Sequence, residues 1–326
     1  MVKTSLSLCL VAVFILIACG RENRITANAE TVGEAQLIDV EVSAGNLSGA
    51  FINAGQGTPI VIIVPGSGPT DRDGNNQGMR SNALKFLAEG LAGNGISSIR
   101  VDKRGMFSSA AAGNPNAVRV DIYGEDYRKW VKTALEISGQ NCAYLLGHSE
   151  GGLMVSAAAL EQNNVCGVIT VAAPGFRASN VLRAQLKANP ANKPILKQAE
   201  NAIAALEAGQ RVDVSKMHSA LQGLFNPEIQ DFWISVFAVD PAQILAAVDA
   251  PKLIIQGEHD LQVSKEDAQR LSEASGGDLI LVPKMNHVLK TAPKRRSANF
   301  KAYNSPDTPI DDRVTDAAAA FIHKHK

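Results

Sequence analysis

The sequence predicts an α/β protein whose mostly parallel central sheet is flanked by helices on both faces. Short apolar segments rich in branched residues recur along the chain, at residues 59–64, 96–102, 143–146, 165–172, 252–256 and 279–282. Segments that are apolar on both faces are typical of parallel strands buried between two helix layers. Helical patterns alternate with them, notably at residues 82–92, 123–137 and 312–322. This alternation predicts one sheet covered on both sides.

The composition narrows the class of protein. The chain has 326 residues, of which 45% are apolar, and it carries 32 basic and 32 acidic side chains. A chain this apolar folds around a core and does not stay disordered. A net charge of zero, without a long basic block, offers no surface that neutralises phosphates, so we expect no nucleic-acid partner.

Residues 1–18 are typical of an export signal peptide. Lys3 precedes an apolar run from Leu6 to Ala18, which as a helix would be about 20 Å long, shorter than the ~30 Å hydrocarbon core of a membrane. The run leads into Cys19 and resembles a bacterial lipobox, and residues 19–36 are polar enough to form a tether. We expect an exported cell-envelope lipoprotein whose only membrane contact is a lipid anchor at Cys19. A soluble periplasmic protein with a cleaved signal is the alternative.

The two cysteines of the predicted core, Cys142 and Cys166, each lie at the beginning of a predicted buried strand. If those strands are neighbours, the two sulfurs lie within bonding reach, and export permits a disulfide. Two separate buried thiols are the alternative. Neither cysteine has the spacing of a metal ligand, so we expect no zinc site.

The predicted domain organisation is one core with an insertion. Residues 37–42 and 47–53 predict an N-terminal hairpin, and the core comprises residues 37–174 and 249–326. Residues 175–248 contain only helical patterns, at 180–187, 193–208 and 227–239. We interpret this segment as a helical lid over the carboxyl edge of the sheet, where open α/β sheets bind ligands. Its larger aromatic residues either line an acyl pocket or pack the lid onto its domain: Phe225, Phe232, Trp233 and Phe237.

A Gly-x-Ser-x-Gly sequence, residues 147–151, lies between the predicted strand 143–146 and a run of small helix formers. A serine on a sharp turn from strand to helix projects its hydroxyl above the sheet, and the flanking glycines relieve crowding. Ser149 is therefore the predicted nucleophile. The alternative is a glycine-rich turn that only lets the strand and the helix pack.

A serine hydroxyl is a poor nucleophile without a neighbouring base. Among the six histidines, His287 follows the last predicted strand and completes the chain order serine, acid, histidine, with each group on a carboxyl-end loop. Asp260 follows the strand 252–256 and is the predicted acid that orients the imidazole. Glu258, in the same loop, is the alternative acid.

A tetrahedral intermediate also needs N–H donors for its oxyanion. One predicted donor is the backbone N–H of Glu150, which follows the nucleophile at a helix N-terminus. The other is the backbone N–H of Ser67, in the loop 65–69 after the strand 59–64. A plain Gly/Pro turn is the alternative interpretation of that loop.

With these residues in place, the sequence resembles the α/β-hydrolase superfamily and, within it, bacterial EstD-type carboxylesterases, close to the serine aminopeptidase S33 group. The matching stretches are residues 64–74, 101–105, 146–152, 255–263 and 285–290. The resemblance implies the α/β-hydrolase fold, and Ser149, Asp260 and His287 match the catalytic triad of the family.

One stretch departs from the family pattern. Residues 106–108, Met-Phe-Ser, replace the small, glycine-containing turn of the relatives. This difference bears on substrate shape and not on the triad. We interpret Asp102 and Arg104 as a structural pair that braces this turn.

The sequence therefore predicts a carboxylesterase-type serine hydrolase that cleaves small to medium acyl esters through an acyl-enzyme. We expect a small-molecule ester substrate, no cofactor and no metal, and the sequence indicates no oligomeric state. The first alternative is a peptidase or amidase on the same triad, with Glu200, Glu207 or Glu228 as an anchor for a peptide terminus. The second is a non-catalytic hydrolase-fold protein that binds a ligand.

Overall fold

The computed structural model describes residues 34–326. The predicted signal peptide, Cys19 and residues 20–33 of the predicted tether lie outside the described residues. Within residues 34–326, no helix is both long enough and apolar enough to cross a membrane.

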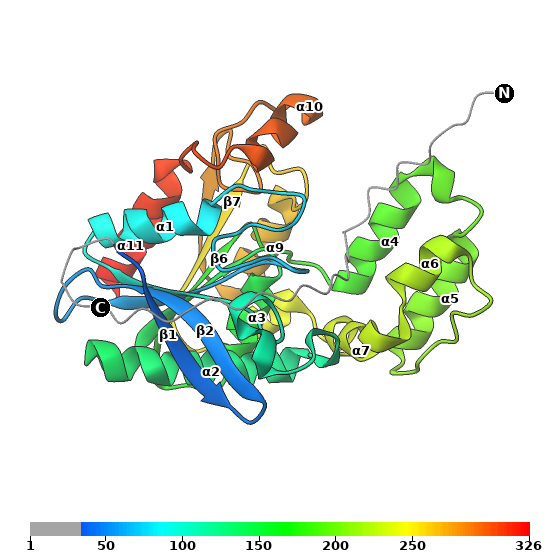
Figure 1. Cartoon of the computed structure of the whole chain (residues 1–326). Coiled ribbons are helices and arrows are strands. Elements are labelled where there is room, and N and C mark those ends of the chain that lie inside the picture. The colour runs from blue at the N-terminus through cyan, green and yellow to red at the C-terminus, as the bar shows by residue number, and fades with distance from the viewer. Residues whose placement is uncertain (1–33) are drawn as a thin grey trace.

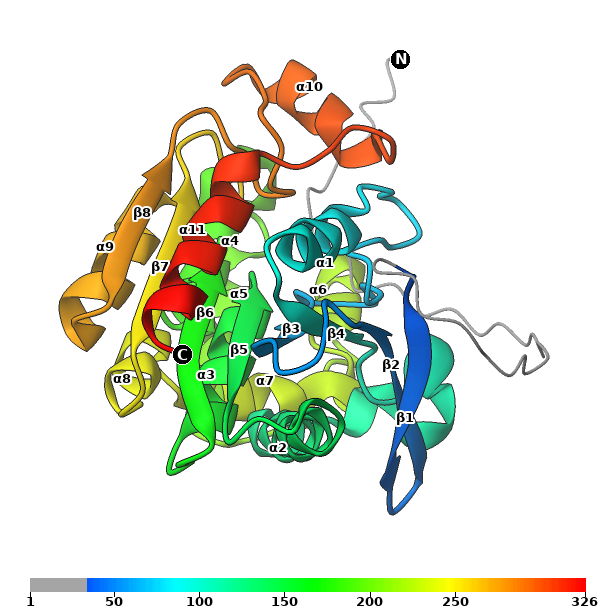
Figure 2. The ribbon, with the colours of Figure 1, turned by 90° about the vertical axis from the view of Figure 1, so that its left-hand side faces the viewer.

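The centre of the fold is a single eight-stranded sheet. Its strands are β1 (Gln36–Val42), β2 (Gly45–Ile52), β3 (Ile60–Val64), β4 (Ser97–Val101), β5 (Ala143–His148), β6 (Val165–Val171), β7 (Lys252–Gly257) and β8 (Asp278–Val282). They lie in the order β1-β2-β4-β3-β5-β6-β7-β8, with the hairpin at one edge and β8 at the other (Figure 2). The pairs β1–β2 and β2–β4 are antiparallel and the other five are parallel. The predicted mostly parallel sheet and N-terminal hairpin are confirmed.

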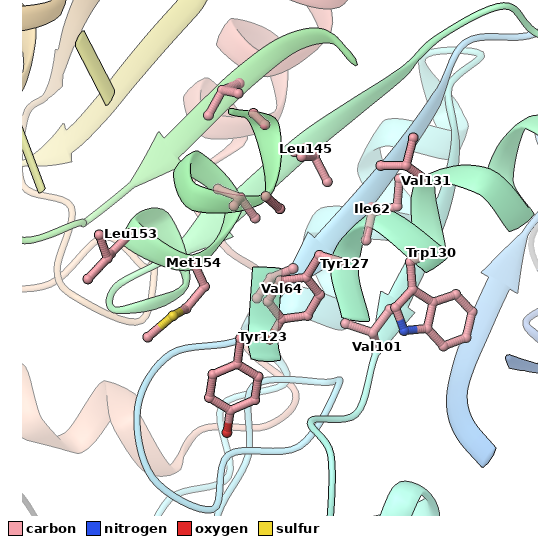
Figure 3. Close-up of a cluster of buried hydrophobic side chains, with 14 of the residues drawn as sticks. Ile62, Val64, Val101, Tyr123, Tyr127, Trp130, Val131, Leu145, Leu153 and Met154 are labelled. Carbon is pink, nitrogen blue, oxygen red and sulfur yellow. The ribbon is translucent and has the colours of Figure 1, made fainter. Parts of the chain in front are cut away.

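Helices cover both faces of the sheet because its central strands are apolar on both. One face packs against α2 (Val120–Ser138), α3 (Gly151–Ala159), α8 (Pro241–Ala246) and α9 (Lys265–Ser275), and the other against α1 (Ala83–Gly93) and α11 (Asp312–Lys324). Successive residues of β3 alternate between these two cores. Ile62 and Val64 lie near Tyr127 and Trp130 of α2 (Figure 3), whereas Val61 faces the side of α1.

Helices replace strands between β6 and β7. They are α4 (Ala178–Ala188), α5 (Leu196–Glu207), α6 (Ser219–Leu224) and α7 (Gln230–Ala238), and we call residues 178–238 the helical insertion. Figure 1 shows these four helices grouped to one side of the sheet. The insertion has its own apolar cluster, in which Phe225 and Phe237 are fully buried and Trp233 packs at the margin, while Phe232 packs on the main core. Phe225 and Phe237 therefore pack the insertion and do not line a pocket; the role of the insertion as a lid stays a prediction.

The structure contains the disulfide between Cys142 and Cys166. The strands at which they lie, β5 and β6, are neighbours and pair in parallel. The bridge, and not the alternative of two separate thiols, is therefore present. It ties the amino ends of two central strands, at the opposite end from the predicted catalytic edge.

The apolar patterns of the sequence do not predict α9. This helix is strongly polar, and Ala268 and Leu271 are its buried apolar residues. Its start is defined by a capping box, in which the Ser264 hydroxyl and the Asp267 carboxylate each bond the backbone N–H of the other residue. The Asp267 carboxylate also accepts the backbone N–H of Gly175 at 2.9 Å, which links this helix to the segment that leads into the insertion.

Candidate active site

Ser149 lies in the tight turn between β5 and α3, as predicted. Its φ of 55° is in the left-handed region, which is strained for a serine. Its backbone N–H donates to the carbonyl of Val171 on β6 at 2.9 Å, which fixes the turn to the sheet. A Cβ at Gly147 would lie 2.2 Å from the carbonyl oxygen of Gly151, and one at Gly151 would lie 2.7 Å from the carbonyl oxygen of Val64. Both positions therefore require glycine, and the turn presents Ser149 at the carboxyl end of the sheet.

Asp260 and His287 lie on the loops after β7 and β8, and they are hydrogen-bonded. The distance from His287 Nδ1 to Asp260 Oδ2 is 2.8 Å, and the Asp260 side chain is fully buried. Because an ionised carboxylate can only accept, Nδ1 donates and Nε2 is left as the basic nitrogen. Glu258, the alternative acid, is exposed and makes no side-chain bond to His287 within the described chain.

The surroundings of Asp260 keep its carboxylate ionised. Burial raises its pKa, but the charge and hydrogen bond of His287 and the backbone N–H groups of Val263 and Gln262 outweigh burial and lower the pKa below its usual value. These N–H groups donate to Oδ1 at 3.0 and 2.7 Å, while His287 uses Oδ2. The aspartate is therefore fixed from two sides in the orientation that holds the imidazole.

His148, which precedes the nucleophile, joins the serine turn to the histidine loop. Its Nε2 lies 2.8 Å from the backbone carbonyl of His287, and the two imidazole rings are 4.9 Å apart. Burial, with a smaller effect of the charge of His287, lowers the pKa of His148 to about 4. The ring is therefore neutral near pH 7 and donates through Nε2. Sequence reasoning rejected His148 as the base and did not predict this positioning contact, since only its place beside Ser149 pointed to it.

Ser149 and His287 are thus brought to the same edge of the sheet through His148. No hydrogen bond joins the Ser149 hydroxyl to His287 among the residues that the structure describes. Catalytic hydrogen bonds are often long before substrate binds, so this arrangement is compatible with a serine–histidine pair.

The loop after β3 lies against the nucleophile. A Cβ at Gly66 would lie 3.0 Å from Ser149 Cβ and 3.5 Å from its Oγ. The next residue is Ser67, and its carbonyl accepts the hydroxyl of Thr70 at 2.9 Å. Within residues 34–326, the backbone N–H groups of Ser67 and Glu150 donate to no backbone carbonyl. The two predicted oxyanion donors therefore lie next to Ser149, and neither is used in a backbone hydrogen bond of the described residues.

The residues after β4 correct one prediction. Asp102 and Arg104 do not pair with each other. Asp102 accepts from the Arg72 guanidinium at 2.6 Å and from its backbone N–H at 2.9 Å, while Arg104 pairs with Asp126 of α2. The two side chains point to different neighbours because Asp102 directly follows β4, whereas Arg104 lies in the turn that the hydrogen bond from the Met106 N–H to the Lys103 carbonyl closes. Arg72 follows the loop 65–69, so the buried Arg72–Asp102 pair ties the segment after this loop to the end of β4.

Lys103, between Asp102 and Arg104, is buried beneath the loop 65–69. We call this loop the oxyanion loop, because it contains Ser67, one of the predicted oxyanion donors. Its Nζ donates to the carbonyls of Gly66 and Gly68, both at 2.5 Å. Burial lowers its pKa to about 8, although the carboxylates of Glu150 and Asp102 act in the opposite direction. The pKa of Glu150 is raised, because the effect of burial outweighs the opposite effect of the Lys103 charge. Sequence reasoning missed Lys103, because a lysine between an aspartate and an arginine looks like a solvent-exposed residue.

Comparisons with known proteins agree with this architecture. A family model described as serine aminopeptidase, S33, matches residues 77–223, a range that contains Ser149. Esterase EstD of Thermotoga maritima is 27% identical over 274 residues, which are 82% of this chain and 62% of EstD. Est1E from Butyrivibrio proteoclasticus, solved with ferulic acid bound, superposes with a TM-score of 0.58 at 15% identity, over 88% of this chain and 98% of Est1E. The Pyrococcus furiosus esterase Pf2001 superposes with a TM-score of 0.56 at 15% identity, over 93% and 98% of the two chains.

The chain adopts the α/β-hydrolase fold, and it is similar in sequence to the serine aminopeptidase S33 family over residues 77–223 and to EstD. The match to EstD supports the predicted EstD-type group. The match spans about 62% of the length of EstD, so EstD has further sequence that the match does not cover. The matched solved structures establish the fold at low sequence identity.

Proposed function

We propose that this α/β-hydrolase is a serine carboxylesterase that cleaves small to medium acyl esters. The observation that carries the proposal is the buried Asp260–His287 hydrogen bond at the same sheet edge as Ser149 in its left-handed turn. The similarity to esterases such as EstD supports an ester as the substrate. A small-molecule ester needs no cofactor for this chemistry, since the triad supplies nucleophile and base.

In the proposed mechanism, His287 Nε2 takes the proton of Ser149 as Oγ attacks the ester carbonyl carbon. The carbonyl oxygen becomes an oxyanion, and the N–H groups of Ser67 and Glu150 bind it. His287 then gives the proton to the departing alcohol, which leaves an acyl-enzyme. Water attacks the acyl carbonyl carbon with His287 again as base, the bond between Oγ and the acyl group breaks, and His287 returns the proton to Oγ as the carboxylic acid is released. Asp260 keeps the imidazole oriented and stabilises its cation in both halves.

The experiment is hydrolysis of p-nitrophenyl acetate and butyrate by the wild type and Ser149→Ala. We expect kcat to fall at least about 10³-fold, because the nucleophile is removed. Ser156→Ala is the matched control, since this buried serine of α3 bonds only the carbonyl of Gly152, at 2.7 Å, and should keep kcat within about threefold. Equal rates for the wild type and Ser149→Ala would contradict the proposal.

The peptidase alternative has one supporting observation, the S33 aminopeptidase description of the matching family model. Its predicted anchors for a peptide terminus are already engaged. Arg183 pairs with Glu200 at 2.8 Å and with Glu207 at 2.7 Å, and Glu228 accepts from Asn116 at 2.7 Å. We therefore rank the esterase first. Turnover of aminoacyl p-nitroanilides at rates that match those of p-nitrophenyl esters would reverse this order.

The export signal, the lipid anchor at Cys19 and the lid role of the helical insertion stay proposals. For the anchor, we expect the intact mass of the membrane fraction to show a chain that begins at Cys19 and carries acyl groups. A chain cleaved near Cys19 without added mass, found in the soluble periplasmic fraction, would favour the soluble alternative. For the lid, shortening the insertion should change which acyl groups are accepted.

A further inference from the structure

A buried cation lies beneath the oxyanion loop and has no part in the triad. Lys103 lies two residues after the end of β4, and only 4% of it is exposed. Its ammonium group donates to two backbone carbonyls, those of Gly66 and Gly68, on either side of Ser67. A buried ammonium is costly unless its hydrogen bonds are satisfied, so this arrangement calls for an explanation.

The carbonyl of Gly66 belongs to the same peptide group as the N–H of Ser67, one of the two proposed oxyanion donors. The carbonyl of Gly66 and the N–H of Ser67 are the two ends of one peptide unit, and no described peptide bond is cis. In a trans peptide the C=O and N–H bonds point in opposite directions. An ammonium group that holds the carbonyl on one side therefore directs the N–H of Ser67 to the other side.

Two carbonyls of this loop also accept hydrogen bonds from Thr70. The Thr70 hydroxyl donates to the carbonyl of Ser67 at 2.9 Å, and the Thr70 backbone N–H donates to that of Gly68 at 2.9 Å. The loop can therefore not rotate the Gly66–Ser67 peptide without breaking bonds to Lys103. Gly66 itself lies against Ser149, so the fixed peptide is beside the reacting hydroxyl.

A simple ion pair does not explain why the ammonium group of Lys103 is buried. Its neighbour Asp102 is engaged by Arg72 through two guanidinium bonds, at 2.6 and 3.0 Å. The salt bridges of residues 34–326 do not include Lys103. Its charge is therefore directed to the carbonyls of the loop.

We propose that Lys103 is a positioning residue that orients and polarises the Gly66–Ser67 peptide as an oxyanion donor, and so stabilises the tetrahedral intermediate more than the bound ester. This inference rests on the proposed esterase function. A charged donor on the carbonyl strengthens the N–H at the other end of the same peptide. This stabilisation grows as negative charge develops on the substrate oxygen, so it raises kcat and leaves KM unchanged.

The test compares Lys103→Met, Lys103→Gln and Lys103→Arg with the wild type. Kinetics use p-nitrophenyl butyrate, and a trifluoromethyl ketone serves as a probe that forms an anionic tetrahedral adduct with the nucleophile. For Lys103→Met we expect kcat to fall about 100-fold and the ketone Ki to rise by a similar factor, because about 10²–10³-fold is typical for loss of one oxyanion donor. KM should stay within about threefold. Lys103→Arg keeps the charge and should recover most of kcat.

Lys290→Met is the matched control for removal of a buried lysine. Its Nζ donates to the backbone carbonyl of Ser305 at 2.5 Å, away from the oxyanion loop. We expect this variant to lose thermal stability without a change in the ratio of ketone Ki to ester KM. If Lys103→Met fails to fold, the comparison of Lys103→Gln with Lys103→Arg decides, with a lower kcat expected for the uncharged glutamine at similar KM.

Equal kcat for the glutamine and arginine variants, or equal rises of ketone Ki and ester KM in Lys103→Met, would overturn the role of Lys103. Neither result would touch the esterase proposal, provided that the wild type hydrolyses the ester and Ser149→Ala does not. An inactive wild type would instead contradict the proposed function itself.

Discussion

The proposed catalytic edge of the sheet and the helical insertion are stabilised in different ways. At the edge, residues that are far apart in sequence hold one another through buried polar bonds, such as His287 with Asp260 and Lys103 with the Gly66 carbonyl. The insertion instead packs around its own apolar cluster and carries partly exposed ion pairs, such as Arg183 with Glu207. Buried polar geometry tolerates little change, whereas an apolar cluster with exposed ion pairs tolerates much.

This difference indicates a division of roles between the two regions. We propose that the sheet edge fixes the chemistry, because Asp260 and His287 each have a partner that sets their orientation. In this proposal, the insertion varies the surroundings of the substrate without moving the triad.

Replacing the acid should have the largest effect. Asp260→Asn keeps the shape of the side chain but removes the carboxylate that accepts from His287, so we expect kcat to fall about 10³–10⁴-fold with a small change in KM. Glu258→Gln is the matched control, since this exposed carboxyl lies in the same loop. Steady-state kinetics with p-nitrophenyl butyrate measure both variants. A larger loss for Glu258→Gln than for Asp260→Asn would reverse the assignment of the acid.

A cavity in the insertion should affect stability and leave the chemistry intact. Phe225 is fully buried in the cluster of the insertion, so Phe225→Ala should cost about 3–5 kcal/mol of local stability. Hydrogen exchange should show faster exchange across α5, α6 and α7 but not across the central strands. The rate of labelling by a small fluorophosphonate should change by less than about threefold. A loss of labelling as large as that of Asp260→Asn would show that the two regions are not separable.

Acid should destabilise the edge through His148. Because burial lowers the pKa of His148 from 6.5 to about 4, the folded state resists protonation and the unfolded chain does not. The stability from the neutral ring is thus fully present above about pH 6.5 and is lost as the pH falls towards 4, by on the order of 3 kcal/mol. Urea unfolding from pH 7 to 4 should show a shallower dependence for His148→Asn. His323→Asn, at an exposed site, should follow the wild type, and identical slopes for all three proteins would refute this role.

Removing an exposed ion pair of the insertion should have the smallest effect. Arg183 bonds both Glu200 and Glu207, whose carboxylates are partly exposed. Such pairs contribute about 0–1 kcal/mol, so Arg183→Met should lower Tm by only a few degrees and leave ester kinetics unchanged. If the freed glutamates bind a peptide terminus, Arg183→Met should improve aminoacyl amide turnover. That result would support the peptidase alternative.

The sequence predicts the sheet well, and it predicts that the proposed triad residues follow strand ends, because both features have local signals. Apolar segments such as residues 143–146 and 165–172 coincide with β5 and β6, and each triad residue follows a strand end. Interactions between distant residues have no such signal. Asp102 pairs with Arg72, 30 residues away, and Lys103 bonds Gly66, 37 residues away, and nothing in the local pattern at 102–104 distinguishes these partners.

The helices also differ in whether the local sequence predicts them. The apolar periodicity of residues 123–137 predicts α2, which is longer at its start by three residues. The polar α9 lacks this periodicity, and a capping box defines it instead. Helices that bury a broad apolar face are thus readable from the sequence, whereas those fixed by caps and by contacts with one or two apolar residues are not.

The most direct test of the account is site-specific labelling of the folded wild type with a fluorophosphonate, followed by peptide mass spectrometry. The account predicts a single modified residue, Ser149, and a large loss of labelling rate in His287→Ala. Modification of a different residue, or no modification of folded protein, would contradict the central claim that Ser149, His287 and Asp260 act together.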